Sequence, residues 1–177
     1  MPIHQLIDRL LTFERRTRRI YQTLSERSEF PARVRAFWKD MADEENRHRG
    51  YLEQTAGLLN FMQSPPSISE AALTSIDEMI AVAEAAVQQP DLNLDDALRQ
   101  ALILEGSELR QLDDIWMAGF DPSMTSLLHA KMPQEAAHLR RLYEAVYAFS
   151  TDTTLHKQAE VMWAAFQEQQ ADGSQEA

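Results

Sequence analysis

The sequence predicts an all-α protein, and three observations support this prediction. Only 5 of the 177 residues are glycine, and Ala, Leu, Glu, Gln and Arg, which favour helices, are abundant. Clusters of β-branched residues, which are typical of strands, are few. Apolar residues recur at alternating intervals of three and four, the period of a helix with one buried face. The length and the 44% apolar content fit a single domain, which we expect to span residues 1–170.

Two long helices are expected first. One runs from about Ile3 to Glu26, and "SEFPA" forms the short turn to the next, which begins at Pro31 and continues to about Phe61. The paired prolines of "QSPPSISE" end the second helix. The segment from Gln63 to Asn93 is then a long crossover that contains the short helix "SEAALTSIDEMIAVAEAAVQ". Such a crossover lets the second and third long helices run parallel in a four-helix bundle.

A third long helix is expected from about Leu94, after an Asp/Asn capping region, to Trp116, and a fourth from about Ser123 to Phe149. Pro133 lies inside the fourth helix, where it predicts either a kink or the start of a new helix at Gln134.

An additional C-terminal helix, "TLHKQAEVMWAAFQEQQ", follows. An isolated amphipathic helix of this length is marginal in water, so we expect Val161, Met162 and Phe166 to be buried against the bundle or a second subunit. A homodimer is the commonest closed assembly and is the oligomer expected here. Residues 171–177 contain nothing to bury and are predicted to be a disordered tail.

Composition excludes several classes of function. The chain has no cysteine, which excludes disulfides, thiolate zinc sites, iron–sulfur clusters and a thiol nucleophile within it. A net charge of −11 argues against nucleic acid as a partner, and the arginines of "ERRTRR" are read as a solvated helix face. No apolar run approaches the roughly 20 residues that span a bilayer, and no signal peptide is recognisable. We therefore expect a cytoplasmic protein without a membrane or nucleic-acid partner.

Each long helix carries carboxylates on its apolar stripe, where Leu or Val would be expected. A buried ion without a partner costs several kcal/mol, whereas a bound cation makes the same carboxylate a ligand. Solvated charges avoid such stripes. The sequence therefore predicts a metal site whose candidate ligands are Glu14 in the first long helix, Glu45 and His48 in the second, Glu105 and Glu108 in the third, and Glu135 and His138 in the fourth.

The strongest signal is the repetition of Glu-x-x-His. One copy alone would more simply be a core histidine bonded to a carboxylate. Two copies, each after a helix with a stripe-facing Glu, match carboxylate-bridged dinuclear sites in four-helix bundles. Glu44 is a rival for Glu45, because Phe37, Met41, Glu44, His48 and Tyr51 also form a helical row. The oxygen and nitrogen ligand set suits two iron ions, with manganese or zinc as other possible occupants.

These residues resemble the ferritin-like superfamily, and within it the rubrerythrin-type proteins. The similarity covers nearly all of the four long helices and rests on "FERRTRRIY", "EENRH", "EGSE" and "EAAH". It implies that Glu14 is the ligand of the first helix and that Tyr21 is a tyrosine beside the site. It also implies that Glu108 exchanges as a ligand beside Glu105.

The resemblance further implies a di-iron oxidoreductase that reduces H₂O₂ or O₂, oxidises Fe²⁺, or does both. Rubrerythrins of the full-length type carry a cysteine-ligated rubredoxin domain, and this chain has no cysteine. An external electron-donor protein would then be the partner of the enzyme. The alternatives are an iron-storage or metal-carrier protein and a ferritin-like scaffold without turnover.

Overall fold

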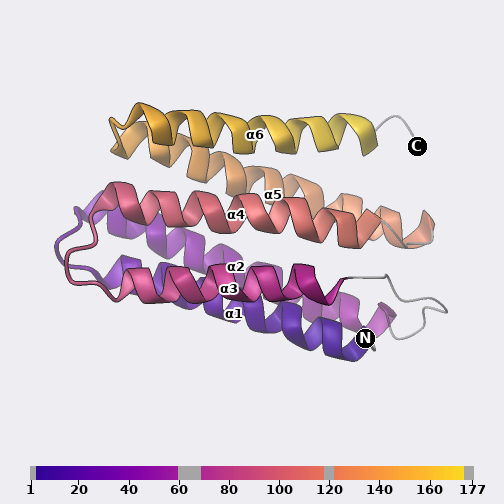
Figure 1. Ribbon diagram of the computed structural model, residues 1–177. Coiled ribbons are helices and arrows are strands. Elements are labelled where there is room, and N and C mark those ends of the chain that lie inside the picture. Colours follow the sequence, from indigo (N-terminus) through magenta and orange to yellow (C-terminus); the bar gives the residue numbers. More distant parts are fainter. Residues whose placement is uncertain (1–2, 60–68, 118–121, 174–177) are drawn as a thin grey trace.

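A computed structural model describes residues 3–59, 69–117 and 122–173, and within them the chain forms α-helices and no strand (Figure 1). The all-α prediction is confirmed. The elements are α1 (Ile3–Glu26), α2 (Ala32–Leu59), α3 (Glu70–Val87), α4 (Leu94–Met117), α5 (Pro122–Phe149) and α6 (Thr153–Gly173). Inside these ranges the described side chains exclude those of residues 3, 55, 57–59, 108–117, 122–135 and 169–173.

Successive helices are antiparallel, and the crossover through α3 makes α2 and α4 run in the same direction (Figure 1). α1 packs on α2, α4 packs on α5, and α2 also contacts α5. The remaining two helices lie outside these pairs: α3 packs against α1 and α4, and α6 packs against α4 and α5. The chain is therefore two helical hairpins, α1–α2 and α4–α5, each partly covered by one further helix.

The apolar stripes read from the sequence form the core. On α2, for example, Val34, Trp38 and Met41 are buried, and the same face continues into Glu45 and His48, which are buried as well. The heptad-like spacing places these side chains on one side of the helix, because residues three and four apart share a face. Burial of the polar members follows from their position on the stripe.

Local capping explains where α2, α3 and α4 begin. The carbonyl of Pro31 accepts from the N–H groups of Val34 and Arg35 at 2.9 and 3.0 Å, so Pro31 closes the first turn of α2 from outside. Ser69 Oγ accepts from the N–H of Ala72 at 3.0 Å, and Asn93 Oδ1 accepts from the N–H of Asp96 at 2.9 Å. These side chains satisfy N-terminal donors of α3 and α4 that no helical carbonyl can reach.

One alternative for the fourth long helix and one expectation for the C-terminal helix are wrong. α5 is one helix from Pro122 to Phe149, so no new helix begins at Gln134, and the alternative of a kink at Pro133 stays a prediction. Met162 and Phe166 of α6 are buried as expected, but Val161 is 69% exposed. The buried positions Leu155, Ala159, Met162 and Phe166 share one face of α6, and Val161 lies off it. α6 ends at Gly173, which extends the helix into the segment expected to be a tail.

None of the helices in the described segments is both long enough and apolar enough to cross a membrane.

Candidate metal centre

Five buried side chains from four helices, three glutamates and two histidines, form one cluster. They make two overlapping triads, and in each triad the candidate ligand atoms all lie within 4.8 Å of one another. Glu45 belongs to both. The first triad is Glu14, Glu45 and His48, and the second is Glu45, Glu105 and His138. Each group could hold a metal ion.

The first triad comes from the α1–α2 hairpin alone. Glu45 and His48 are three residues apart, so they share one face of α2, and Glu14 faces them from the antiparallel helix α1. His48 Nδ1 lies 3.5 Å from Glu45 Oε2 and 3.9 Å from Glu14 Oε2. All three side chains are buried. The imidazole nitrogen therefore points at the two carboxylates.

The second triad joins three helices. His138 of α5 is fully buried, and its Nε2 lies 3.0 Å from Glu105 Oε2 of α4 and 3.4 Å from Glu45 Oε1 of α2. The rings of His48 and His138 meet edge to face, with centroids 5.1 Å apart. The two triads are thus neighbours that share a carboxylate.

The second nitrogen of His138 is held by a further carboxylate. His138 Nδ1 lies 2.9 Å from Glu44 Oε2, and because an ionised carboxylate only accepts, we place the proton on Nδ1. That bond leaves Nε2 facing Glu45 and Glu105. Buried Glu44 is itself paired through Oε1 with Arg47 at 3.1 Å and Arg141 at 3.0 Å. A carboxylate that orients a ligand histidine in this way is a common feature around metal sites.

An aromatic pair lies on the other side of the second triad. The Tyr21 hydroxyl of α1 donates a hydrogen bond to Glu105 Oε1. The ring of Tyr21 stacks on Trp38, with centroids 5.7 Å apart and planes 17° from parallel, and both side chains are fully buried. Tyr21 therefore fixes the orientation of the Glu105 carboxylate from within the core.

The pKa of His138 and that of Glu44 move in opposite directions. Burial alone would lower the pKa of His138. The negative charge of Glu105 and its hydrogen bond to His138, the hydrogen bond to Glu44, and the charge of Glu45 instead raise this pKa well above the ordinary value. Burial alone would raise the pKa of Glu44, but the hydrogen bond and charge of His138, with the charges of Arg141 and Arg47, lower it. Without metal, the pair therefore favours an imidazolium beside a carboxylate.

The donor set fits a pair of cations. Three carboxylates and two imidazoles share one buried volume, and neither triad contains Lys or Arg. Bringing carboxylates together out of water is unfavourable unless positive charge compensates them. Oxygen donors with imidazole suit iron, manganese or zinc. Metal binding would displace the proton from His138 Nε2 and replace its charge with that of the cation.

The predicted residues fall into two groups. Glu14, Glu45, His48, Glu105 and His138 are brought together, and Tyr21 lies beside them. The side chains of Glu108 and Glu135 lie outside the described residues.

Three residues around His138 were not predicted as part of the site: Glu44, Arg47 and Arg141. Glu44 appeared in the sequence only as a rival of Glu45. The second helical row through Phe37, Glu44 and Tyr51 is the signal that could have identified its role, because α2 faces α5 as well as α1.

No protein-family model matches the sequence, and no curated protein and no solved structure matches the chain.

Proposed function

We propose that this chain is a ferritin-like di-metal protein of the rubrerythrin type, a di-iron oxidoreductase that reduces H₂O₂ or O₂, oxidises Fe²⁺, or does both. The observation that carries the proposal is the pair of buried triads that share Glu45 and draw their ligands from α1, α2, α4 and α5. These four helices would be the bundle, α3 the helix within its crossover, and α6 the additional C-terminal helix.

Two ferrous ions bound there would supply one electron each to the reduction of a peroxide or O₂. Glu45 would help to hold both ions, because its carboxylate oxygens face both histidines: Oε2 lies 3.5 Å from His48 Nδ1 and Oε1 lies 3.4 Å from His138 Nε2. Glu14 would complete one position and Glu105 the other.

The surrounding residues would position the ligands and hold protons. Glu44 accepts a hydrogen bond from Nδ1–H of His138 and so presents Nε2 to the site. Tyr21 holds its phenolic proton against Glu105 Oε1. Buried apolar residues on the same stripes, Met41, Leu98 and Leu142 among them, limit the access of water.

Anaerobic metal loading followed by oxidation tests the proposal. Protein exchanged into Fe²⁺ and freed of excess metal should retain about two irons per chain, the stoichiometry of a dinuclear bundle site. Addition of H₂O₂ should then produce the near-ultraviolet absorption of an oxo-bridged ferric pair. Iron content is measured by elemental analysis and the oxidation by stopped-flow absorbance.

Two variants of α2 provide the matched comparison. Glu45→Ala removes the shared carboxylate and should retain almost no iron, whereas Asp43→Ala removes an exposed carboxylate two positions away and should load as wild type does. Retention of two irons by Glu45→Ala, or a wild type that binds none, would contradict the proposal.

A further inference from the structure

Basic residues are concentrated in the first hairpin. Of the 17 Lys and Arg residues, 11 lie within residues 1–49 together with only 8 of the 28 Asp and Glu residues, so that segment carries a net charge of +3. The other 6 basic and 20 acidic residues give residues 50–177 a net charge of −14. Three of the acidic residues in the first segment, Glu14, Glu44 and Glu45, are buried, so its surface is more positive still. The N-terminal segment of an acidic protein thus carries a net positive charge.

Part of this positive charge is neutralised by α3 and its C-terminal end. Arg9 pairs with Glu70, and Arg16 pairs with Asp77 and Glu84. Arg27 donates to the carbonyls of Val87, Gln89 and Pro90 at 2.9–3.2 Å, where it satisfies carbonyls at and just beyond the C-terminal end of α3. These contacts hold the crossover against α1 and use the arginines on that side of the helix.

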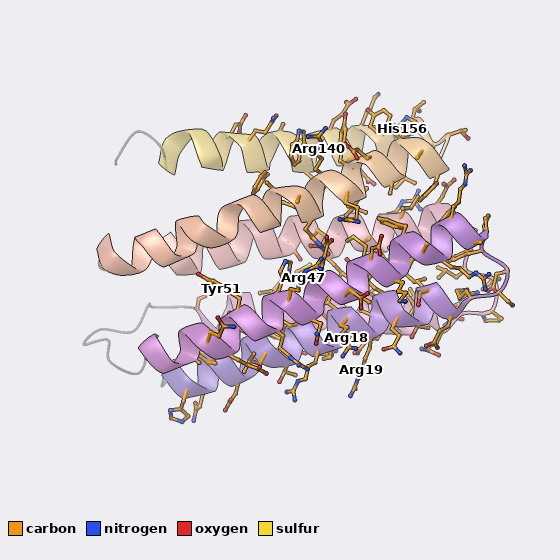
Figure 2. All side chains as sticks on the ribbon, turned by 180° about the vertical axis from the view of Figure 1, so that it is seen from behind. Arg18, Arg19, Arg47, Tyr51, Arg140 and His156 are labelled. Carbon is orange, nitrogen blue, oxygen red and sulfur yellow. The ribbon has the colours of Figure 1, made fainter. Side chains whose placement is uncertain are left out.

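Five further basic residues of α1 and α2 take no part in these contacts. We define the basic face as Arg15, Arg18 and Arg19 of α1 with Arg35 and Lys39 of α2. Within the described part of the chain no carboxylate lies within ion-pair distance of any of the five. The stacking of Tyr21 on Trp38 shows that α1 and α2 are side by side at this level. Figure 2 shows α2 at the front of this view with α1 beside it, and Arg18 and Arg19 labelled there.

The basic face shares α2 with the candidate metal centre, because α2 carries Arg35 and Lys39 and also supplies Glu45 and His48. Two further arginines lie nearer to the centre, between α2 and α5. Arg47, labelled in Figure 2, and Arg141 pair with Glu44, which contacts His138. The basic face therefore lies on a helix that supplies ligands of the candidate centre.

We propose that the basic face docks an acidic one-electron carrier protein that supplies electrons to the centre, an inference that rests on the proposed function. Reduction of one H₂O₂ to two H₂O consumes two protons and two electrons, and two reduced carriers that each become oxidised provide those electrons. The chain itself has no cysteine with which to hold an iron–sulfur cluster. A carrier of negative charge is attracted to the basic face and repelled by the rest of the molecule, which orients the encounter.

The test measures docking separately from electron transfer. The probe is a plant-type [2Fe–2S] ferredoxin, which is acidic, and cytochrome c is the basic comparison carrier. Binding to zinc-loaded protein is measured by calorimetry at low and at high ionic strength, so the readout does not depend on turnover. Electron transfer is measured as the reoxidation of reduced ferredoxin by iron-loaded protein and H₂O₂.

Two single charge reversals provide matched variants. Lys39→Glu changes a lysine of the basic face, and Lys157→Glu changes a lysine of α6, also exposed, in the acidic part of the chain. We expect wild type to bind ferredoxin but not cytochrome c, with affinity that falls as salt rises. Lys39→Glu should weaken binding about fivefold or more, because reversal removes an attraction and adds a repulsion, whereas Lys157→Glu should change it by less than about twofold.

The outcomes separate the two proposals. Salt-sensitive binding that Lys39→Glu weakens, without electron transfer, supports the docking face and counts against the redox function. Electron transfer that is equal in both variants overturns the docking face and leaves the redox function intact. Absence of ferredoxin binding at low salt overturns the docking face. A salt-sensitive dimer in ultracentrifugation that Lys39→Glu dissociates also overturns it, because the face would then be occupied by the acidic side of a second copy.

Discussion

The two triads differ in how much of the molecule is needed to build them. Glu14, Glu45 and His48 all belong to the α1–α2 hairpin, whose helices are joined by a short turn. Glu45, Glu105 and His138 come from three helices in both halves of the chain. The first triad can assemble as soon as one hairpin forms, whereas the second exists only when the α4–α5 hairpin has packed against α2. Metal in the second position should therefore stabilise the assembled fold more directly than metal in the first.

The surrounding contacts extend this difference. The second triad is supported by Glu44 on His138 and by Tyr21 on Glu105, and each of these contacts joins two helices. Arg141 of α5 adds a further link, since it pairs with both Asp40 and Glu44 of α2. His138 therefore contacts two carboxylates of α2, Glu44 beside the triads and Glu45 within them.

The largest expected effect comes from removing the carboxylate that both triads share. Bound metal adds RT ln(1 + [L]/Kd) to the free energy of unfolding, about 2.7 kcal/mol for one site at 100 times Kd. We expect Fe²⁺ to raise the melting temperature of wild type under anaerobic conditions and a chelator to reverse the rise. Glu45→Ala should lose this metal-dependent difference entirely. A melting temperature of wild type that is the same with Fe²⁺ and with chelator would contradict a metal centre.

Comparison of the two histidines separates the triads. His48→Ala and His138→Ala should each retain about one metal per chain, because each removes one imidazole and leaves the other position. The metal-dependent rise in melting temperature should be smaller in His138→Ala, since that variant loses the position that links the two hairpins. Metal content and differential scanning calorimetry, with and without chelator, measure both quantities. Equal loss of stabilisation in the two variants would show that the triads do not differ in this way.

The helices and most of the cluster could be predicted because both follow from one pattern. Periods of three and four identify the buried face of each helix, and a carboxylate or histidine on that face is visible in the sequence. Glu45 and His138 were found in this way, and both are buried. The pattern was enough to predict their burial because each of these residues lies on the three-and-four spacing of the apolar stripe of its helix.

The errors arise where a helix has more than one packing partner or where an apolar residue lies off the buried face of its helix. Glu44 was set aside as an alternative to Glu45, yet both are buried because α2 contacts α1 and α5 on different sides. Val161 was expected to be buried with Met162 and Phe166 as part of an amphipathic helix, although it lies off the face of α6 that holds those two residues. The distribution of charge across the fold could be counted in the sequence, but which arginines remain without an ion pair depended on where α3 packs.

A moderate effect is expected from the carboxylate that orients His138. Glu44→Gln keeps the size of the side chain and removes its charge, so the hydrogen bond to Nδ1 weakens and Nε2 becomes a poorer ligand. Changes of this kind around metal sites cost roughly 10- to 100-fold in metal affinity. Competition with a metal-chelating dye measures the affinity. Asp43→Asn, the same chemical change at the exposed neighbouring residue, should bind as wild type does, and an equal loss in both variants would contradict a role for Glu44.

The smallest expected effect is the pH dependence of the metal-free protein, which isolates the second triad. Against the burial that would lower it, Glu105, Glu44 and Glu45 raise the pKa of His138 well above its ordinary value in the folded chain. A group whose folded pKa is raised stabilises the fold fully below the unfolded pKa, about 6.5 for histidine, and this contribution is lost as pH rises through the folded pKa. His138 should therefore make the metal-free wild type less stable as pH rises above about 6.5.

The metal-loaded protein should respond to pH in the opposite direction, because a cation at Nε2 must displace the proton and binds more tightly as pH rises. Melting temperatures of metal-free and loaded protein, measured at several values between about pH 6 and 9, test both signs around the histidine pKa. His138→Gln should lose the destabilisation of the metal-free form with rising pH, whereas His156→Gln, whose ring stacks on Tyr147 outside the triads, should keep the wild-type slope. Identical slopes for wild type and His138→Gln would mean that His138 does not carry the proton that holds the two hairpins together in the absence of metal.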